Sequence, residues 1–415
     1  MKRFFTTLAA TALIFTASAQ DHKESNYDES KVPQYTLPET LTFNNGKRVK
    51  NARQWERRRR SEVLKLFAEH EYGSPLPKLE PVKCEVVESG EAFGGKGIRR
   101  QVRLTFEAGG QSRSALILIY LPKQTAPAPV FLCYNFKGNH TTCRDPKVIP
   151  SPLSQEERGA AEGRWSYEMI LDAGYGVVTA HYWDFYPDSD SAESLAQSIL
   201  PLFGFNTPED IAETSTQSIG AWAWGYSRIM DYLETCSDID SRKVALMGHS
   251  RLGKTALWAG AIDARFAAVI SNESGCSGAA ISRRCYGERI YRITHSFPHW
   301  FCPKYMSYGY AEEKLPMDQH ELLALIAPRP LYVASAREDR WSDPRGEFLG
   351  LQGAAEVYGL YGISFDVPEG YLAEDQPACE RPIIGHLGYH LRSGKHDVTP
   401  YDWTQYIKFL DKVLK

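Results

Sequence analysis

A serine flanked by glycines is the strongest chemical signal in this chain of 415 residues. The segment GHSRLG, residues 248–253, follows a short apolar run at 244–247 and precedes a run of small and apolar residues at 255–261 that suits a helix. A strand that turns directly into a helix exposes the turn residue at the carboxyl edge of a sheet, where the helix N-terminus stabilises a developing anion. Ser250 is therefore a candidate nucleophile, although the second glycine falls one position later than in G-x-S-x-G. The alternative is that Ser250 only caps the helix.

A serine hydroxyl is a weak nucleophile at neutral pH, so it needs a histidine base and a carboxylate that orients the base. Enzymes that carry the nucleophile on a strand–helix turn place the acid, and then the histidine, later in the chain. His396 lies in GKHDVTPYDW, residues 394–403, just before the last expected helix, and is the favoured base. His386 and His390 compete with it because they fall in the same expected loop region, whereas His320 lies in an expected helix and is more simply structural.

Two carboxylates follow expected strands and are candidates for the orienting acid. Glu273 comes directly after the apolar segment at 267–272, and Asp339 follows the next strand along the chain, at 330–336. Each could also be an ordinary surface carboxylate. The choice between the two acids stays open at this stage.

The pattern of elements around these residues predicts an α/β fold. Alternating hydrophobicity at 82–106 and apolar runs at 114–122 and 127–136 predict antiparallel strands near the N-terminus. Strands then alternate with helices, which predicts a mostly parallel, doubly wound sheet between two layers of helices. This three-layer αβα sandwich with an antiparallel beginning is the arrangement of the α/β-hydrolase fold. The expected strands are 176–182, 244–247, 267–270 and 330–336, and the expected helices are 54–70, 165–173, 219–236, 317–326, 345–358 and 401–413.

No internal repeat, low-complexity linker or shift in composition divides the chain. We therefore expect a single catalytic domain over residues 20–415, with an N-terminal extension at about 20–80. The stretch at about 276–316 is too long for an ordinary connection and is expected to be an insertion near the site.

The first 19 residues have the features of a cleavable signal peptide. Lys2 and Arg3 precede a short apolar stretch, and Ala17-Ser18-Ala19 is a typical cleavage site. We expect cleavage after Ala19 and a secreted or periplasmic protein. No later stretch is long and apolar enough to cross a bilayer, and the formal net charge of -3 gives no case for nucleic acid or an anionic membrane as a partner. The arginine run at 57–60 is expected to be a solvated helix face.

The eight cysteines match no zinc-binding pattern. An exported protein permits disulfides, and Cys133 with Cys143, or members of the group at 276–302, are near enough in sequence to pair. Reduced cysteines in the core are an equal alternative for a chain of this size.

Several motifs together resemble the glucuronoyl esterases, carbohydrate esterase family 15, in their bacterial form. The matching stretch runs from about residue 115 to 403. The motifs are GHSRLGK at 248–254, SNESGC at 271–276, DQH at 318–320, APRP at 327–330 and EDRWSDP at 338–344.

The resemblance implies a role for each candidate catalytic residue. Ser250 matches the nucleophile and His396 the base, while Arg251 matches an arginine that stabilises the oxyanion. Glu273 matches the acid of one branch of the family, and Asp339 matches the acid position of other members. This chain has both acids, which departs from the single-acid pattern.

The resemblance also implies a sugar-binding set. Lys254 matches a sugar-binding lysine, and Glu288 and Trp341 match residues that hydrogen-bond the uronate hydroxyls and cover the sugar. Without the resemblance, Lys254 and Glu288 could equally form a structural ion pair. Fungal relatives have cysteines at the positions of His249 and Asp397, so the disulfide that tethers their base cannot form here, and His249 is expected to pack in the turn.

The implied activity is hydrolysis of the ester between 4-O-methyl-glucuronic acid side groups of glucuronoxylan and lignin alcohols. We expect a monomer that needs no metal and no organic cofactor. One alternative is another carbohydrate esterase, such as an acetyl xylan esterase. The other is a non-catalytic carbohydrate-binding protein on a hydrolase scaffold.

Overall fold

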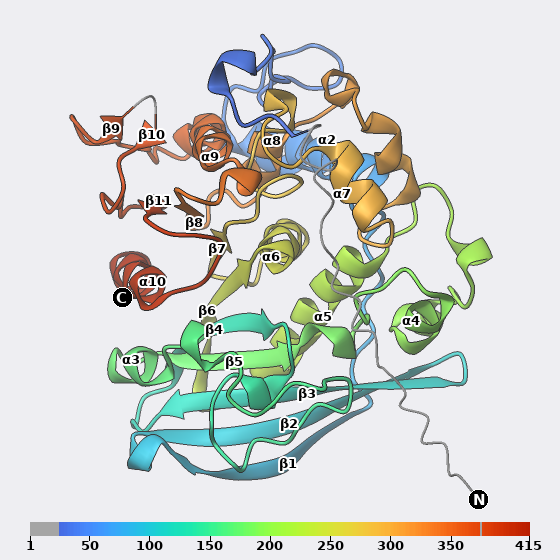
Figure 1. Ribbon diagram of the computed structural model, residues 1–415, viewed down its shortest axis with the longest axis vertical. Coiled ribbons are helices and arrows are strands. Elements are labelled where there is room, and N and C mark those ends of the chain that lie inside the picture. The colour runs from blue at the N-terminus through green and yellow to red at the C-terminus, as the bar shows by residue number, and fades with distance from the viewer. Residues whose placement is uncertain (1–24, 374–375) are drawn as a thin grey trace, which may run out of the picture.

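A mixed sheet of nine strands forms the centre of the computed structural model, which describes residues 25–373 and 376–415 (Figure 1). The spatial order of the strands is β1-β2-β3-β5-β4-β6-β7-β8-β11. Strands β1, β2 and β3 and their junction with β5 are antiparallel, and the pairs from β5 to β11 are parallel. The expected sheet is thus confirmed. The strands are β1 (Lys83–Ala92), β2 (Gly97–Ala108), β3 (Gln111–Pro122), β4 (Ala128–Asn135), β5 (Gly176–His181), β6 (Ile239–His249), β7 (Ala268–Asn272), β8 (Leu331–Ala336) and β11 (Leu387–Arg392).

Helices cover both faces of the sheet. Helices α3 and α10 lie on one side, and α5, α6, α8 and α9 lie on the other (Figure 1). The main helices are α2 (Arg60–His70), α3 (Tyr167–Asp172), α4 (Ala192–Gln197), α5 (Ser218–Leu233), α6 (Arg251–Ile262), α7 (Ile290–Ser296), α8 (Gln319–Ala324), α9 (Pro344–Gly359) and α10 (Pro400–Leu414). A short hairpin, β9 (Leu372–Ala373) and β10 (Gln376–Pro377), lies apart from the main sheet.

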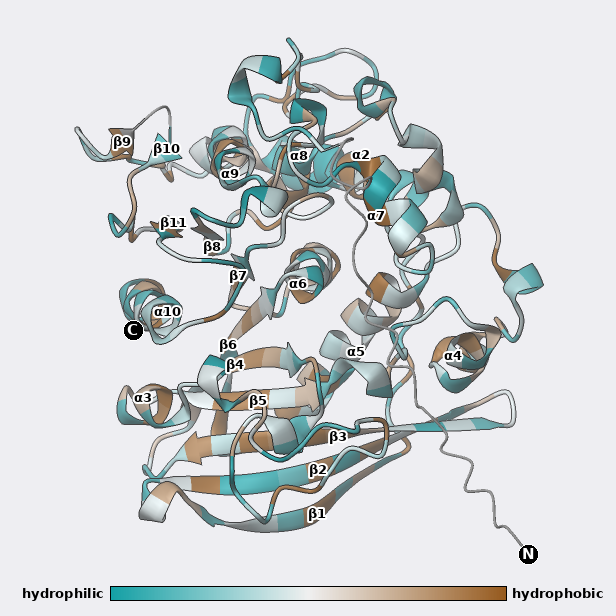
Figure 2. Cartoon of the chain, viewed as in Figure 1, coloured by the Kyte–Doolittle hydropathy of each residue, from teal (hydrophilic) through white to brown (hydrophobic). Residues whose placement is uncertain are grey.

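The central strands are apolar on both faces because both faces are covered. In β4, Val130 and Leu132 belong to the buried cluster on the α5 and α6 side, while Phe131 and Cys133 belong to the cluster on the α3 and α10 side. This alternation follows from the two-residue period of a strand. In Figure 2, β4 and β5 are mostly brown, whereas β1 and β2 mix brown and teal.

The arginine run at 57–60 is only partly a solvated face. It lies in a five-residue π-helical segment (Trp55–Arg59) and the start of α2. Arg59 is buried and forms an ion pair of 3.0 Å with Glu321, and Arg60 donates to the carbonyl oxygen of Ala261 at 2.6 Å. Two of the arginines therefore attach the N-terminal helix to the rest of the fold, through Glu321 in α8 and Ala261 in α6.

Residues 26–29 lie against the expected insertion at 276–316. Gly287 N–H donates to the carbonyl oxygen of Asn26 at 2.8 Å, and Tyr27 packs edge-on against Tyr286. Glu29 accepts from Arg284 at 2.6 Å. The insertion itself contains α7 and several short 3-10 turns.

All eight cysteines are unpaired thiols in the structure. Among the described residues, no helix has the length and apolar character needed to cross a membrane. The expected signal peptide, residues 1–19, lies outside the described residues.

Candidate active site

Ser250 occupies a strained turn between β6 and α6. Its φ of 58° and ψ of -128° are unfavourable for a residue with a side chain, and such strain is found at functional turns. The flanking glycines make the turn possible. A Cβ at Gly248 would lie 1.9 Å from the carbonyl oxygen of Leu252, and one at Gly253 would lie 2.9 Å from the Cβ of Ser274. The turn is fixed by the Ser250 N–H, which donates to the carbonyl oxygen of Asn272 at 2.9 Å.

His396 lies between β11 and α10, and both candidate acids face the same nitrogen of its ring. The Nδ1 atom is 2.6 Å from Oδ2 of Asp339 and 3.1 Å from Oε2 of Glu273. Glu273 directly follows β7 and Asp339 follows β8, so adjacent parallel strands deliver the two carboxylates to one edge of the sheet. The ring of His249, the residue before Ser250, lies 4.4 Å from the ring of His396.

The three groups perturb one another's pKa values. Burial raises the pKa of Glu273 to about 7, although His396 and Arg392 oppose this. Burial also acts to raise the pKa of Asp339, but hydrogen bonding and charge from His396 hold it below its usual value. Burial lowers the pKa of His396, and the two carboxylates raise it by more, to about 9. As the pH falls, Glu273 is thus the carboxyl that takes up a proton first, and Asp339 stays ionised beside the imidazole.

Arg392 holds both Glu273 and the histidine loop, and sequence reasoning did not identify it. Its guanidinium donates to Oε1 of Glu273 at 2.5 Å and to the carbonyl oxygens of Lys395 and Asp397 at 2.9 and 2.7 Å. It also pairs with Asp402 at 3.0 Å. The loop that carries His396 is therefore attached to the buried acid by a cation.

The two competing histidines have structural positions. The expectation that His386 and His390 share a loop region with His396 is wrong for His390, which lies on β11, parallel to β8. His390 is buried on β11, with Nε2 2.8 Å from Oδ1 of Asp402. His386 interacts with the carbonyl oxygen of Pro328. His320 is buried in α8 and contacts the carbonyl oxygen of Pro38, as expected for a structural histidine.

Arg251, at the first position of α6, forms an ion pair with Asp188. Its guanidinium carbon lies 4.7 Å from the centre of the Trp300 ring. Asp188 also accepts from Nε2 of His299 at 2.8 Å and from the Trp300 indole at 2.7 Å. Burial alone would raise the pKa of Asp188, but these donors and Arg251 hold it well below its usual range. Asp188 thus fixes the arginine beside the serine, and no motif in the sequence marks it.

Glu288 and Trp341 form a wall on the β7 and β8 side of the serine. The Glu288 N–H donates to the carbonyl oxygen of Trp341 at 2.9 Å, and the Trp341 side chain hydrogen-bonds the Glu288 carboxylate. Both residues are half-buried. Burial raises the pKa of Glu288, and the charges of Lys254, Arg251 and His396 oppose it. The carboxylate therefore lies within electrostatic range of the serine turn and of the histidine.

Lys254 is buried under this wall and does not extend into open solvent. It is 4% exposed, and its Nζ donates to the carbonyl oxygen of Ser274 at 2.5 Å. The buried carboxyl of Glu71 interacts electrostatically with it. Burial raises the pKa of Glu71 to about 8, and Gln319 donates to both of its oxygens. Glu71 is a second partner of Lys254, and no motif in the sequence indicates it.

His249 has the packing role expected for it. Its Nδ1 lies 2.5 Å from Oδ1 of Asn272, whose amide donates to the Tyr406 hydroxyl at 2.8 Å. Burial lowers the pKa of His249 well below its usual value, and the charge of His396 lowers it further. A neutral ring therefore lies against His396. On the far side, Asp397 is 2.6 Å from Nε of Arg164.

The ligand atoms of Glu273, Asp339 and His396 lie within 4.8 Å of one another, a spacing that a divalent ion could also bridge. Nδ1 of His396 is already within hydrogen-bond distance of both carboxylates, so a proton on this nitrogen satisfies the cluster. The chemistry of this set is that of a histidine base with its orienting acids.

Comparison with known proteins places this chain in a family. The model of fungal glucuronyl esterases matches residues 163–362. A carbohydrate esterase from an unknown prokaryotic organism is 45% identical over 403 residues, which cover 93% of this chain and 91% of the relative. A 4-O-methyl-glucuronoyl methylesterase of Schizophyllum commune is 30% identical over 380 residues, 88% of this chain and 83% of the relative.

Two solved structures are similar over nearly their whole length. A promiscuous esterase of carbohydrate esterase family 15 from a marine bacterial metagenome is 44% identical, with a TM-score of 0.84 and coverage of 93% of this chain and 99% of that one. A glucuronoyl esterase from Solibacter usitatus is 43% identical, with a TM-score of 0.84 and coverage of 92% and 99%. These similarities extend over nine-tenths of the chain, and the turn at Ser250 and the contacts of His396 with two carboxylates agree with them. The chain therefore belongs to carbohydrate esterase family 15, the glucuronoyl esterases.

Proposed function

We propose that this protein is a serine esterase that hydrolyses the ester between 4-O-methyl-glucuronic acid side groups of glucuronoxylan and lignin alcohols. The observation that carries the proposal is the approach of two carboxylates to Nδ1 of His396, beside a strained serine turn. Relatives named as 4-O-methyl-glucuronoyl methylesterases support the glucuronate part of the substrate.

In the first half of the reaction, Oγ of Ser250 attacks the ester carbonyl carbon and His396 takes the hydroxyl proton. The carbonyl oxygen becomes an oxyanion. The first N–H groups of α6, on Arg251 and Leu252, are available to it, whereas those of Gly253 and Lys254 already donate to the carbonyl oxygen of Ser250. The guanidinium of Arg251, fixed by Asp188, adds positive charge at the same place. Collapse of the tetrahedral intermediate breaks the bond to the alcohol, which leaves with the proton from His396.

In the second half, His396 removes a proton from water, which attacks the acyl-enzyme and releases the glucuronate and the Ser250 hydroxyl. Asp339 and Glu273 keep the proton on Nδ1 of His396 throughout, so Nε2 faces the reaction. Both halves use only acid–base and covalent chemistry of the chain.

The sugar of the uronate is proposed to lie against Glu288 and Trp341. A half-buried carboxylate accepts hydrogen bonds from sugar hydroxyls, and an indole covers the C–H face of the ring. Lys254, held by the carbonyl oxygen of Ser274, places positive charge within electrostatic range of the Glu288 carboxylate. We further propose one catalytic domain, exported by the signal peptide and acting as a monomer.

Replacing Ser250 by alanine tests the proposal. Purified Ser250→Ala should hydrolyse benzyl glucuronate at least about 10⁴-fold more slowly than the wild type. Ser112→Ala, at an exposed serine on β3, is the matched control and should retain full activity. Unchanged turnover by Ser250→Ala refutes the mechanism. Wild-type activity on acetylated xylan that exceeds activity on glucuronate esters refutes the substrate.

A further inference from the structure

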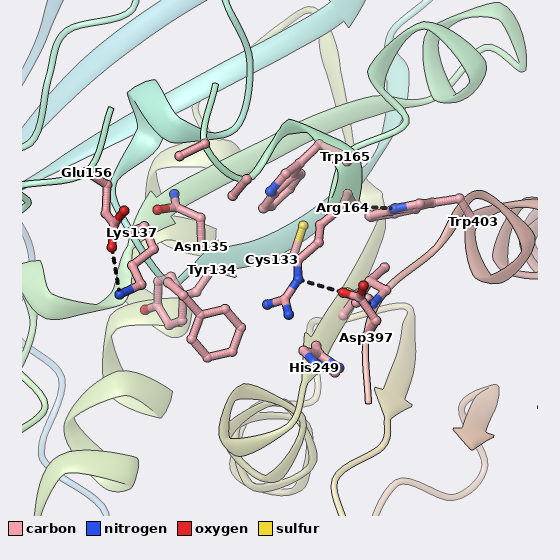
Figure 3. Close-up of a pocket in the computed structure, with 16 residues that line it drawn as sticks. Cys133, Tyr134, Asn135, Lys137, Glu156, Arg164, Trp165, His249, Asp397 and Trp403 are labelled. Carbon is pink, nitrogen blue, oxygen red and sulfur yellow. Dashed lines mark hydrogen bonds and ion pairs between the residues drawn. The ribbon is translucent and has the colours of Figure 1, made fainter. Parts of the chain in front are cut away.

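A cavity of about 490 Å³ lies next to the candidate active site and has no role in the chemistry described above (Figure 3). Its walls come from the end of β4, the segment before α3, the end of β6 and the loop that carries His396. Its volume falls in the range of pockets that enclose small organic molecules, about 300–1,000 Å³. The lining residues used in the argument are Phe136, Arg164, Trp165, His249, Asp397 and Trp403.

The cavity is lined by the sequence neighbours of Ser250 and His396. His249 lines it and immediately precedes Ser250, and Asp397 lines it and immediately follows His396. The Phe136 ring lies 6.0 Å from the guanidinium carbon of Arg251 and also 6.0 Å from that of Arg164. Phe136 is therefore a partition between the oxyanion side of the serine turn and the cavity.

The cavity and the wall of Glu288 and Trp341 lie on opposite sides of the serine. Phe136 follows β4, which pairs with β6 on one side, whereas β7 and β8 lie on the other side of β6. The backbone of Glu288 is bonded to Trp341, in the loop after β8. An ester extends in two directions from its carbonyl carbon. When the uronate occupies the β7 and β8 side, the alcohol extends toward β4.

The lining suits a flat aromatic group with polar substituents. Trp165 stacks on Tyr167 with ring centres 5.4 Å apart, and the Trp403 indole donates to the carbonyl oxygen of Arg164 at 2.8 Å, so the indoles are fixed (Figure 3). The rim carries charged pairs, Arg164 with Asp397 at 2.6 Å and Lys137 with Glu156 at 3.1 Å. Rigid aromatic walls bind aromatic rings well. At a solvated rim, carboxylates accept hydrogen bonds from hydroxyl groups, and cationic side chains donate to hydroxyl and ether oxygens.

We propose that this cavity is the subsite for the aromatic alcohol of the ester substrate. The proposal rests on the proposed function, because it assigns a place to the leaving group of that reaction. The occupant that we propose is an aryl alcohol. The competing occupant is a xylan chain, and the experiment below distinguishes the two.

The test compares methyl, benzyl and cinnamyl esters of glucuronic acid. For each ester we measure kcat/KM, which reports all steps through departure of the alcohol. The acyl-enzyme that this departure leaves behind is the same for all three esters. The quantity of interest is the ratio of the aryl value to the methyl value. The intrinsic difference in reactivity between the leaving groups cancels when this ratio is compared between the wild type and a variant.

Two variants change the cavity in different ways. Trp165→Leu removes an aromatic wall, and Ala160→Trp fills the cavity from a lining position at which the alanine is exposed. We expect the aryl-to-methyl ratio to fall about fivefold to tenfold in each, the size of the loss of one aromatic contact. Trp183→Leu is the matched control: another half-buried tryptophan, it lines a separate hollow, and its ratio should equal the wild-type ratio.

The outcomes separate the inference from the proposed function. Absence of wild-type activity on all three esters refutes the proposed function itself. Full activity with an unchanged ratio in both cavity variants overturns the inference alone. Loss of activity only on polymeric glucuronoxylan esters, with unchanged ratios on the small esters, also overturns it and assigns the cavity to the xylan chain.

Discussion

Removing the two carboxylates beside His396, singly and together, tests how the base is oriented. Asp339 and Glu273 lie 2.6 and 3.1 Å from the same Nδ1 atom. A hydrogen bond to a charged group contributes about 1.5–3 kcal/mol. After one acid is removed, the other still accepts from Nδ1, so a single variant loses only part of this energy. We expect kcat/KM to fall about 10-fold for Glu273→Ala and about 30-fold for Asp339→Ala, the shorter contact.

The double variant should be far slower than the product of these effects. With neither acid present, nothing fixes the tautomer of His396, and loss of the orienting acid in a serine triad costs about 10⁴-fold. The product of the single losses is about 300-fold, so the interaction energy of the cycle is about 2 kcal/mol. Arg392 retains Asp402 at 3.0 Å in every variant, which keeps its charge paired.

The assay is kcat/KM for benzyl glucuronate at fixed pH, with thermal unfolding measured for each variant. Glu338→Ala is the control, since this exposed carboxylate directly precedes Asp339 and should leave activity unchanged. A double variant no slower than Asp339→Ala would show that Asp339 orients His396 alone. That result would refute the argument that the acids share the task.

Three further predictions use other parts of the site. The base is active when deprotonated, and the acids raise the pKa of His396 to about 9, so wild-type kcat/KM should still rise at pH 8; in Asp339→Ala the rise should occur at lower pH, and an unshifted pH profile contradicts this. Arg251→Met should lower kcat about 100-fold with little change in KM for methyl glucuronate, because the charge acts on the oxyanion. A rise in KM of similar size with an unchanged kcat would instead indicate that Arg251 binds the ground state. Burial raises the pKa of Glu347 from 4.5 to about 8, so the folded state binds its proton more tightly and this group's stabilisation falls as pH rises between those values; in Glu347→Gln the free energy of unfolding, measured in urea, should fall less from pH 5 to pH 8.

The buried centre of the fold was predictable because its strands are continuous apolar runs. The segments of β4 and β6 are buried on both faces, and this pattern is visible without any knowledge of partners. Strand β11 was not predicted, because it contains His390 and Arg392, which are rare in a buried strand. Both are stabilised there by Asp402, which lies in α10. That compensation depends on contacts between elements and leaves no local pattern.

In the site as well, residues marked by a local sequence pattern were predicted, and residues that depend on contacts between distant elements were not. Ser250 lies in a turn whose glycines and strand are contiguous, the two acids follow predicted strands, and His396 precedes a predicted helix. Asp188 could not be found this way, because its partners Arg251, His299 and Trp300 are dispersed over the chain. Lys254 was expected to bind the sugar, but its buried position depends on the contact of its Nζ with the carbonyl oxygen of Ser274, which no local pattern indicates.

The attachment of the His396 loop sets the order in which the site can form. The loop is fixed by Arg392 on β11 and by Asp402 in α10, the last strand and the last helix of the chain. During synthesis from the N-terminus, the turn at Ser250 is complete long before these segments exist. The contacts that join this loop to the rest of the site, His396 with Asp339 and Arg392 with Glu273, link residues 57 and 119 positions apart. Such contacts form late in folding, because closing long loops costs entropy. A partly synthesised chain therefore carries Ser250 without His396 in place, and we expect the proposed esterase activity to begin only after α10 has docked.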